Sequence, residues 1–523
     1  MIRIMQARNG QLTAQADGRT LYSRYDPAAE AMRFVRRELA SAQQCASVMI
    51  LGEGLGYLTA ALRTLLPAAR IVAVHLHAEL FARRICDADQ QWCVAASGQT
   101  TFEQFLEQQI ADEEIDGLQL ITWEPCTRAF ATQAEPIAAA VRNFLDQRSA
   151  SLATERCYGA RWISNSVVNA IELQPLPRIQ GRNAPVAIAA GGPSLPESLQ
   201  LLKQRDRGVS LWALPSALPI LLHAGCPPDL VITTDAGFYA THHLRQLRTW
   251  PSIPLAAPLS AALISQLRRR PTLILNQGSW FEHDLLSDSG LPWLAIPPHG
   301  TVAGSAWYLA AALGATEVVF AGLDLCIRDV RSHPRGHAFE PLLYSGEQRL
   351  RPLHHVLFER NVATSERIAE ASIERTSRAL RTYASWFRGH AAAMPIPASR
   401  LAPSPVDTAL ASCKRLPRCA DAGYAGPGTP VSAVDRRHAL HERLCAWRRQ
   451  TEELNSALCT AGTQRDQRQQ RLLAMARTVD TAGYLQALRA LRNNDQPDKR
   501  VQRLQRRLQQ FFDHLRRRVE QAT

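Results

Sequence analysis

Short aliphatic runs, each ending in a turn with glycine or aspartate and followed by a helical pattern, recur along this chain. Residues 186–190 lead into Gly-Gly-Pro-Ser-Leu, and residues 317–321 lead into Gly-Leu-Asp. Similar runs lie at 47–51 and 229–233. Strands that alternate with helices indicate a parallel sheet covered by helices on both faces. The sequence therefore predicts an α/β fold.

The chain is too long, at 523 residues, for one ordinary core. The pattern predicts an N-terminal Rossmann-like domain, a linker helix that ends near Pro175 and Pro177, a central doubly wound α/β domain and a C-terminal helical domain. We place these parts at residues 1–150, 151–180, 181–405 and 406–523.

The C-terminal part is helical and basic. Residues 411–523 hold 22 Lys and Arg against 11 Asp and Glu, whereas the remainder is nearly balanced. Apolar residues at helical spacing over 440–458 and 501–519 predict two amphipathic helices, packed as an antiparallel hairpin or small bundle. The excess charge suits an acidic protein, a nucleic acid or an anionic membrane, or is simply a solvated face. Without interleaved aromatic residues, we expect no specific nucleic-acid binding.

The composition of the chain indicates the cellular compartment in which the protein resides. No run approaches the roughly 20 apolar residues that span a bilayer, and the first residues lack the apolar core of a secretion signal. The 11 cysteines are scattered and odd in number, so we expect thiols rather than disulfides, and their spacing fits no zinc site. These features predict a cytoplasmic protein with no membrane span.

The segment Gly191-Gly192-Pro193-Ser194-Leu195 follows a strand and opens a helix. Glycines let backbone approach a ligand closely, and the N-terminus of a helix attracts phosphate. Ser194 and Glu197 have the spacing of a capping box, which predicts that the helix starts at Ser194. The motif is equally compatible with a tight βα turn that binds nothing.

Two aspartates are expected at the carboxyl edge of the same sheet, where open α/β sheets bind ligands. Asp235 follows Thr234 after one strand, although an aspartate there also serves as a helix cap. Asp324 follows Gly322 after another, and the residues next along the chain suit an anionic donor and acid–base chemistry: Arg328, Arg331, His333, Arg335 and His337.

The N-terminal domain has a glycine turn of its own, Gly52-Glu53-Gly54-Leu55-Gly56. Dinucleotide and S-adenosylmethionine sites place an acidic residue at the end of the next strand. Here the nearest acid is Glu79, beyond that position. We interpret this turn as structural.

The order of these motifs resembles the motility-associated factor (Maf) flagellin glycosyltransferases. Besides the glycine turns, the resemblance rests on Gly159-x-Arg-Trp-x-x-Asn165-x-x-x-Asn169, on 213–222 with Ala224-Gly-Cys-Pro-Pro-Asp229, on 302–314, and on Gly322-x-Asp324 with His and Gly336 downstream. It covers roughly residues 40–390.

The resemblance implies a central glycosyltransferase domain similar to the GT-A-type and sialyltransferase folds. It implies a CMP-linked nonulosonic acid, of the pseudaminic or legionaminic type, as donor substrate and Ser or Thr of flagellin as acceptor, with no obligatory cofactor and no metal. The donor residues carried over are Gly191, Gly192, Pro193, Ser194, Leu195, Thr234 and Gly322. The catalytic residues are Asp324, Asp235 and His333, any of which could be the base.

Two other readings stay open. The central domain also resembles archaeal pterin pyrophosphokinases, which bind ATP and Mg²⁺ through carboxylates. Alternatively, the chain is a non-enzymatic assembly factor that binds flagellin, with the basic helices as its docking part.

Overall fold

The computed structural model describes residues 2–40, 46–94, 100–176, 183–370, 372–401, 406–419, 436–460, 465–493 and 496–521. It divides into two compact units. The first contains Met1–Cys157 and Thr481–Leu504, and the second contains Tyr158–Asp480 and Gln505–Thr523.

The first unit is built on a parallel sheet of four strands in the order β6-β5-β4-β7, counted over the described residues. An antiparallel sheet of β1, β2 and β3 adjoins the same core. The strands are β1 (Ile2–Gln6), β2 (Leu12–Ala16), β3 (Arg19–Thr20), β4 (Ser47–Glu53), β5 (Arg70–His75), β6 (Gln90–Cys93) and β7 (Leu118–Thr122). The helices are α1 (Pro27–Leu39), α2 (Tyr57–Leu65), α3 (Ala78–Ala82), α4 (Phe102–Gln109), α5 (Glu124–Ala129) and α19 (Thr481–Asn493), with the 3-10 turn η1 (Asp112–Gly117).

The expected linker helix is part of a much longer one. Helix α6 (Ala131–Glu172) has 42 residues and runs from the first unit into the second. Only its second half was expected from the sequence, although the buried residues Ile137, Val141 and Phe144 recur at helical spacing in the first half as well. The helix ends as predicted just before Pro175, while Pro177 lies outside the described residues.

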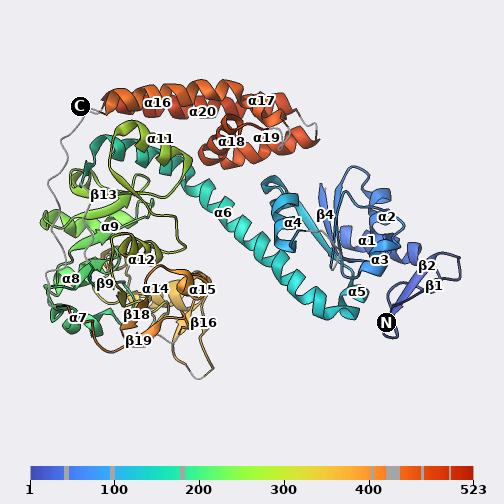
Figure 1. The fold of residues 1–523 in the computed structure, drawn as a ribbon, viewed down its shortest axis with the longest axis horizontal. Helices are drawn as coiled ribbons and strands as arrows, with labels where there is room; N and C mark the ends of the chain where they lie inside the picture. Colours follow the sequence, from blue (N-terminus) through green and yellow to red (C-terminus); the bar gives the residue numbers. More distant parts are fainter. Residues whose placement is uncertain are drawn as a thin grey trace. The chain divides into compact units, whose positions relative to one another are not determined.

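The second unit contains a parallel sheet in the order β14-β13-β12-β11-β10-β9-β15-β18-β19, with β8 beside β13 (Figure 1). The strands are β8 (Gln174–Pro175), β9 (Val186–Ala189), β10 (Ser210–Ala213), β11 (Leu230–Ile232), β12 (Leu255–Pro258), β13 (Pro271–Asn276), β14 (Trp293–Ala295), β15 (Val318–Ala321), β18 (Ala398–Leu401) and β19 (Ala411–Cys413). The predicted α/β fold is confirmed. From β9 the chain adds strands toward one edge of the sheet, and from β15 it adds them toward the other edge, so the strand order reverses between these two neighbours.

Connections between these strands are mostly helical. They are α7 (Leu195–Lys203), α8 (Leu218–His223), α9 (Ala240–Leu244), η2 (Arg245–Thr249), α10 (Ser265–Arg268), α11 (Trp280–Ser289), α12 (Val302–Ala312), α13 (Glu340–Tyr344), α14 (Leu353–Leu357), the π-helical turn η3 (Phe358–Val362), α15 (Arg378–His390) and η4 (Ala391–Ala393), with a small hairpin of β16 (Glu366–Arg367) and β17 (Arg375–Thr376). The core of the sheet packs against α12 around Trp307, Phe320 and Phe387.

The C-terminal helices contain the expected antiparallel pair. Helix α16 (Arg437–Gln450) lies beside α20 (Pro497–Gln521) in Figure 1, and the pair is formed within the second unit by α16 and by the part of α20 from Gln505 on. His441 pairs with Glu520 and Arg448 with Asp513, so the two helices run in opposite directions. The remaining elements here are η5 (Thr451–Glu453), α17 (Leu454–Cys459) and α18 (Gln467–Val479). No helix in the described residues is both long and apolar enough to cross a bilayer.

Candidate functional site

Three loops meet where the strand order of the sheet reverses. They follow β9, β10 and β15, whose carboxyl ends lie side by side. A Cβ on Gly191 would lie 2.5 Å from Ser216 Oγ, and a Cβ on Gly192 would lie 2.6 Å from Asp324 Oδ2. Gly322 has φ +69°, and a Cβ on it would clash with the carbonyl oxygen of Ala190. The structure gives these glycines a role the motif did not suggest, since they let the three loops touch.

Asp324 occupies the N-terminus of α7. Its Oδ2 accepts the N–H of Ser194 at 2.6 Å, and its Oδ1 accepts the Ser194 hydroxyl at 2.6 Å. The side chain is only 2% exposed, and this burial raises the pKa of Asp324, which the bonds from Ser194 oppose. A carboxylate of the protein therefore holds the position that the sequence assigned to a phosphate.

The N–H groups at this helix start, where the sequence suggests a phosphate, are engaged within the protein. Gly192 N–H donates to Gly322 O, Leu195 N–H to Gly192 O and Glu197 N–H to Ser194 O. Pro193 and Pro196 have no N–H to offer. The helix does begin after Ser194, but without the predicted capping box, because the Ser194 hydroxyl donates to Asp324 and the Glu197 carboxylate pairs with Arg328 at 2.8 Å.

Asp235 lies on the same edge of the sheet, beyond β11. Its Oδ1 accepts the N–H of Gly237 at 2.7 Å, and its side chain is exposed. Thr234 beside it is half-buried. Since β10 and β9 separate β11 from β15, the structure brings the two aspartates to one edge but not into one pocket.

The paired asparagines of the Gly159–Asn169 segment hold α6 against this edge. Asn169 Nδ2 donates to the carbonyls of Leu259 and Ala261 at 2.7 and 2.8 Å. Asn165 Nδ2 donates to Ser260 O at 2.9 Å and to Ala236 O at 3.4 Å. These residues fix the loops that follow β11 and β12.

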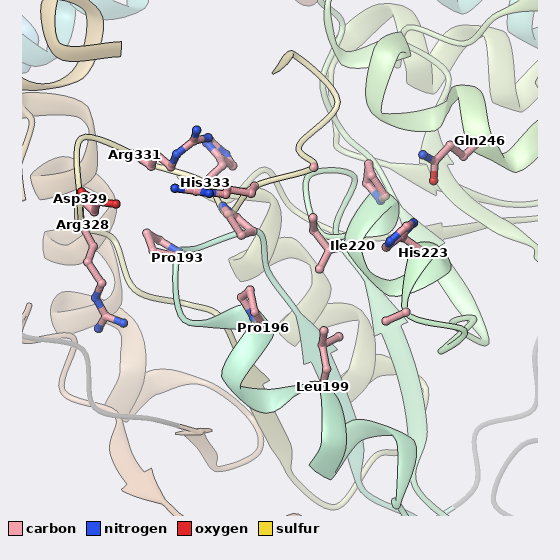
Figure 2. A pocket seen from close by; sticks show the side chains of 15 residues that line it. Pro193, Pro196, Leu199, Ile220, His223, Gln246, Arg328, Asp329, Arg331 and His333 are labelled. Atoms are coloured by element: carbon pink, nitrogen blue, oxygen red, sulfur yellow. The ribbon is translucent and has the colours of Figure 1, made fainter. Parts of the chain in front are cut away.

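A pocket of about 620 Å³ lies between α7, α8 and the segment 328–336. In Figure 2, side chains from α7 and α8 lie below the segment that carries Arg331 and His333. The lining residues are Pro193, Pro196, Leu199, Pro219, Ile220, His223, Ala224, Gln246, Arg328, Asp329, Arg331, His333, Pro334, Arg335 and Gly336.

Only part of the predicted site lines this pocket. Pro193, Arg328, Arg331, His333 and Arg335 do. The other predicted residues lie beneath it or elsewhere along the edge: Gly191, Gly192, Ser194, Leu195, Thr234, Gly322, Asp235 and Asp324. Sequence reasoning did not identify the residues on the α8 side of the pocket, which are Pro219, Ile220 and His223, nor Gln246 in η2. The one available signal was that the α8 segment follows directly after a strand.

The cations of the pocket differ in their partners. Arg328 pairs with Glu197 at 2.8 Å and with Glu374 at 3.1 Å, and Arg331 pairs with Glu340. Arg335 is exposed and has no hydrogen-bond or ion-pair partner in the part of the chain that the structure describes. Arg335 is thus the cation whose charge is available to an anionic ligand.

Three imidazoles form a cluster that reaches the pocket through His333. The ring of His333 lies 4.1 Å from that of His337, which lies 4.8 Å from that of His243. Burial lowers the pKa of His333 and of His243 to about 4 and that of His337 to about 2, and neighbouring cations and imidazoles act in the same direction. At neutral pH, His333 therefore presents an uncharged imidazole to the pocket.

The glycine turn of the first unit is closed. The N–H groups of Gly54 and Leu55 donate to the hydroxyl of Tyr22 at 3.0 and 3.1 Å, and Tyr22 is buried. A bound phosphate would use donors of this kind. The structure supports the interpretation of this turn as structural.

Three comparisons relate this chain to known proteins, and one of them shows the fold. Residues 161–330 match the family model described as 6-hydroxymethylpterin diphosphokinase MptE-like. An uncharacterized protein of Treponema pallidum (strain Nichols) is 28% identical over 286 residues, which are 54% of this chain and 59% of that protein, so the match spans less than two thirds of the relative. The solved structure of a Maf glycosyltransferase from Magnetospirillum magneticum AMB-1 superimposes with a TM-score of 0.61 at 13% identity, over 99% of this chain and 91% of that one. The expected resemblance is confirmed at the level of the fold: over nearly its whole length, this chain has the fold of a Maf glycosyltransferase.

Proposed function

We propose that this chain is a glycosyltransferase and that the pocket between α7 and α8 binds a nucleotide-linked sugar. The observation that carries the proposal is the pocket itself. It opens at the carboxyl edge of a parallel sheet, beside the reversal of strand order, and is lined by Arg331, Arg335 and His333. The fold shared with a Maf glycosyltransferase supports this class of reaction.

The donor we favour is a CMP-linked nonulosonic acid. Such a donor carries one phosphate and one sugar carboxylate, both anionic. Arg335, with no carboxylate partner among the described residues, is suited to one of these groups, whereas the neighbouring Arg331 is already paired with Glu340. The apolar walls, formed by Pro196, Leu199 and Ile220, suit the uncharged faces of a base or sugar.

His333 is the best supported base of the three predicted catalytic residues. Both oxygens of Asp324 accept bonds from Ser194, and Asp235 does not line the pocket. His333 lines it and is uncharged at neutral pH, and its Nδ1 lies 3.0 Å from Ser332 Oγ. The role of base requires the tautomer in which Nδ1–H donates to Ser332 Oγ, so that Nε2 holds the lone pair that accepts a proton. The acceptor hydroxyl attacks the anomeric carbon, its proton passes to His333 Nε2, and the bond to the CMP oxygen breaks.

The acceptor we propose is Ser or Thr of flagellin, modified in the cytoplasm before export. This part follows from the sequence resemblance alone. It is tested by incubating the protein with a CMP-nonulosonic acid and flagellin and measuring the mass of flagellin. We expect one or more sugar increments, lost in His333→Gln and strongly reduced in Arg335→Gln. Arg349→Gln changes an exposed arginine outside the pocket and is the matched control.

A second function is favoured by one specific observation, the match of residues 161–330 to a pterin diphosphokinase family. Titration calorimetry with CMP, and separately with ATP and Mg²⁺, separates the two. Binding of ATP with Mg²⁺ but not of CMP contradicts our proposal. Binding of flagellin without any mass increment in the transfer experiment indicates instead a non-enzymatic assembly factor.

A further inference from the structure

The segment that lines the top of the pocket contains a tight hairpin turn. Arg328 N–H donates to Arg331 O at 2.9 Å, and Arg331 N–H donates to Arg328 O at 3.0 Å. The two residues between them, Asp329 and Val330, have φ values of +48° and +57°. Two consecutive left-handed residues identify a two-residue hairpin of the primed type.

The second position of this turn is occupied by an unfavourable residue. Primed turns usually carry glycine there, because a Cβ disfavours positive φ. Val330 is β-branched, and such a residue in the left-handed region is an outlier. Strain of this kind persists only where the surroundings hold it, and it is concentrated at functional sites.

One side chain holds the strained residue. Asn361 Nδ2 donates to the carbonyl of Val330 at 2.8 Å. Asn361 belongs to the π-helical turn η3, an irregularity that is frequent at functional sites. It also lines a cavity of about 120 Å³ together with Arg331 and His333, both of which face the larger pocket as well.

The turn decides where the pocket residues lie. Before it, Arg328 is tied to Glu197 on α7 and to Glu374. After it, Arg331, His333 and Arg335 follow within four positions and line the pocket. A change in direction at Asp329 and Val330 would therefore move all three side chains together.

We propose that Asn361 is a positioning residue for the pocket: by holding the carbonyl of Val330 it keeps the strained turn closed, and the closed turn fixes Arg331, His333 and Arg335 in place. The effect on sugar transfer rests on the function proposed above. The state of the turn does not, because it can be measured without any substrate.

The first experiment is amide hydrogen exchange of the peptide that contains residues 325–335, in the full chain. Asn361→Ala should speed exchange of the Arg328 and Arg331 amides by roughly fivefold, the size expected for one lost hydrogen bond. In the Val330→Gly background the same change should have less than half that effect, since glycine adopts the left-handed φ without help. Arg351→Gln, which removes only an exposed ion pair to Glu359 beside η3, should change nothing.

The second experiment measures binding of CMP by calorimetry and the KM and kcat for a CMP-sugar. Asn361→Ala should weaken CMP binding and raise KM roughly fivefold at unchanged thermal stability, and Val330→Gly should restore most of the loss. If Asn361→Ala leaves exchange of the turn unchanged, or speeds it equally in both backgrounds, the proposal is wrong. It is also wrong if exchange rises but CMP binds as in the wild type. If the wild-type protein neither binds CMP nor transfers sugar, the proposed function fails, and the exchange experiment still decides the role of Asn361 at the turn.

Discussion

Asp324 and Ser194 lie 130 positions apart in the sequence, yet their contact defines the centre of the second unit's sheet edge. Each was predicted as a site residue for a separate reason, one as an acid and the other as part of a phosphate turn. In the structure the acid is bound to the turn, with both carboxylate oxygens engaged by Ser194. No local pattern encodes this pairing, because it depends on β9 and β15 being neighbours.

Replacement of Asp324 tests whether it is a structural or a catalytic residue. Asp324→Ala leaves the buried N–H of Ser194 without an acceptor and removes a negative charge from the start of α7. We expect the free energy of unfolding of the second unit to fall by about 1–3 kcal/mol, and less in Asp324→Asn, which keeps one acceptor. Urea denaturation followed by tryptophan fluorescence measures this loss.

The control for this change is Asp329→Asn, at an exposed position in the same loop, where asparagine tolerates the positive φ. If Asp324→Ala keeps wild-type stability but loses sugar transfer, the structural role is contradicted. Asp324 would then be the better candidate for the catalytic base.

At the scale of elements, two strands of the large sheet, β12 and β18, were missed because they carry few β-branched or large aliphatic residues. β12 is Leu-Ala-Ala-Pro and β18 is Ala-Ser-Arg-Leu. Such residues are common in loops as well, so a segment rich in Pro and Ala resembles a loop in sequence even where it contains β18. Their strand conformation comes from pairing with β11, β13, β15 and β19.

The same limit applies to the pocket. Arg331, His333 and Arg335 were predictable because they cluster in one loop that follows a strand. Ile220 and His223 were not, since only the packing of α8 beside α7 turns them toward that loop.

The attachment of α6 gives a prediction at this scale. Asn169 is buried and supplies the donor for two carbonyls, those of Leu259 and Ala261. Asn169→Ala should lower the free energy of unfolding by about 1–3 kcal/mol, because both acceptors lose their partner. Asn169→Asp has the same shape but no N–H, so it should be at least as damaging. Asn455→Ala, at an exposed position, is the control, and equal stability of all three variants in urea denaturation would contradict the role.

For the molecule as a whole, each unit contains both buried acids and buried imidazoles whose pKa is shifted by burial, with Glu53 and His75 in the first unit and Glu282 beside the three histidines in the second. Burial raises the pKa of Glu53, in the first unit, from its ordinary 4.5 to about 7. In the second unit, burial lowers the pKa of His333 and His243 from 6.5 to about 4 and that of His337 to about 2. Each shift favours the uncharged form in the folded state. An acid is uncharged at low pH and an imidazole at high pH, so the two kinds of group stabilise the fold at opposite ends of the pH range.

The signs of these shifts predict opposite responses to pH. The contribution of Glu53 is fully present below pH 4.5 and is lost as the pH rises through about 7, because the unfolded chain ionises first. The contribution of the histidines is present above pH 6.5 and is lost as the pH falls toward 4, because the unfolded chain binds protons that the folded one does not. Raising the pH from about 5 to about 8 should therefore remove the contribution of Glu53 and restore that of the histidines, with His75 of the first unit among them.

Hydrogen exchange, read separately for peptides from β4 and from β15, measures both responses in one protein. Other titrating groups contribute in each unit, so the decisive quantity is the difference between wild type and variant. Glu53→Gln should remove the loss of protection in β4 at about pH 8, and His337→Phe should reduce the loss in β15 at about pH 5. Because each variant alters a group in the core of one unit, each should leave the pH dependence of the other unit unchanged. A pH response of β4 that is the same in Glu53→Gln as in the wild type would show that Glu53 is not its source.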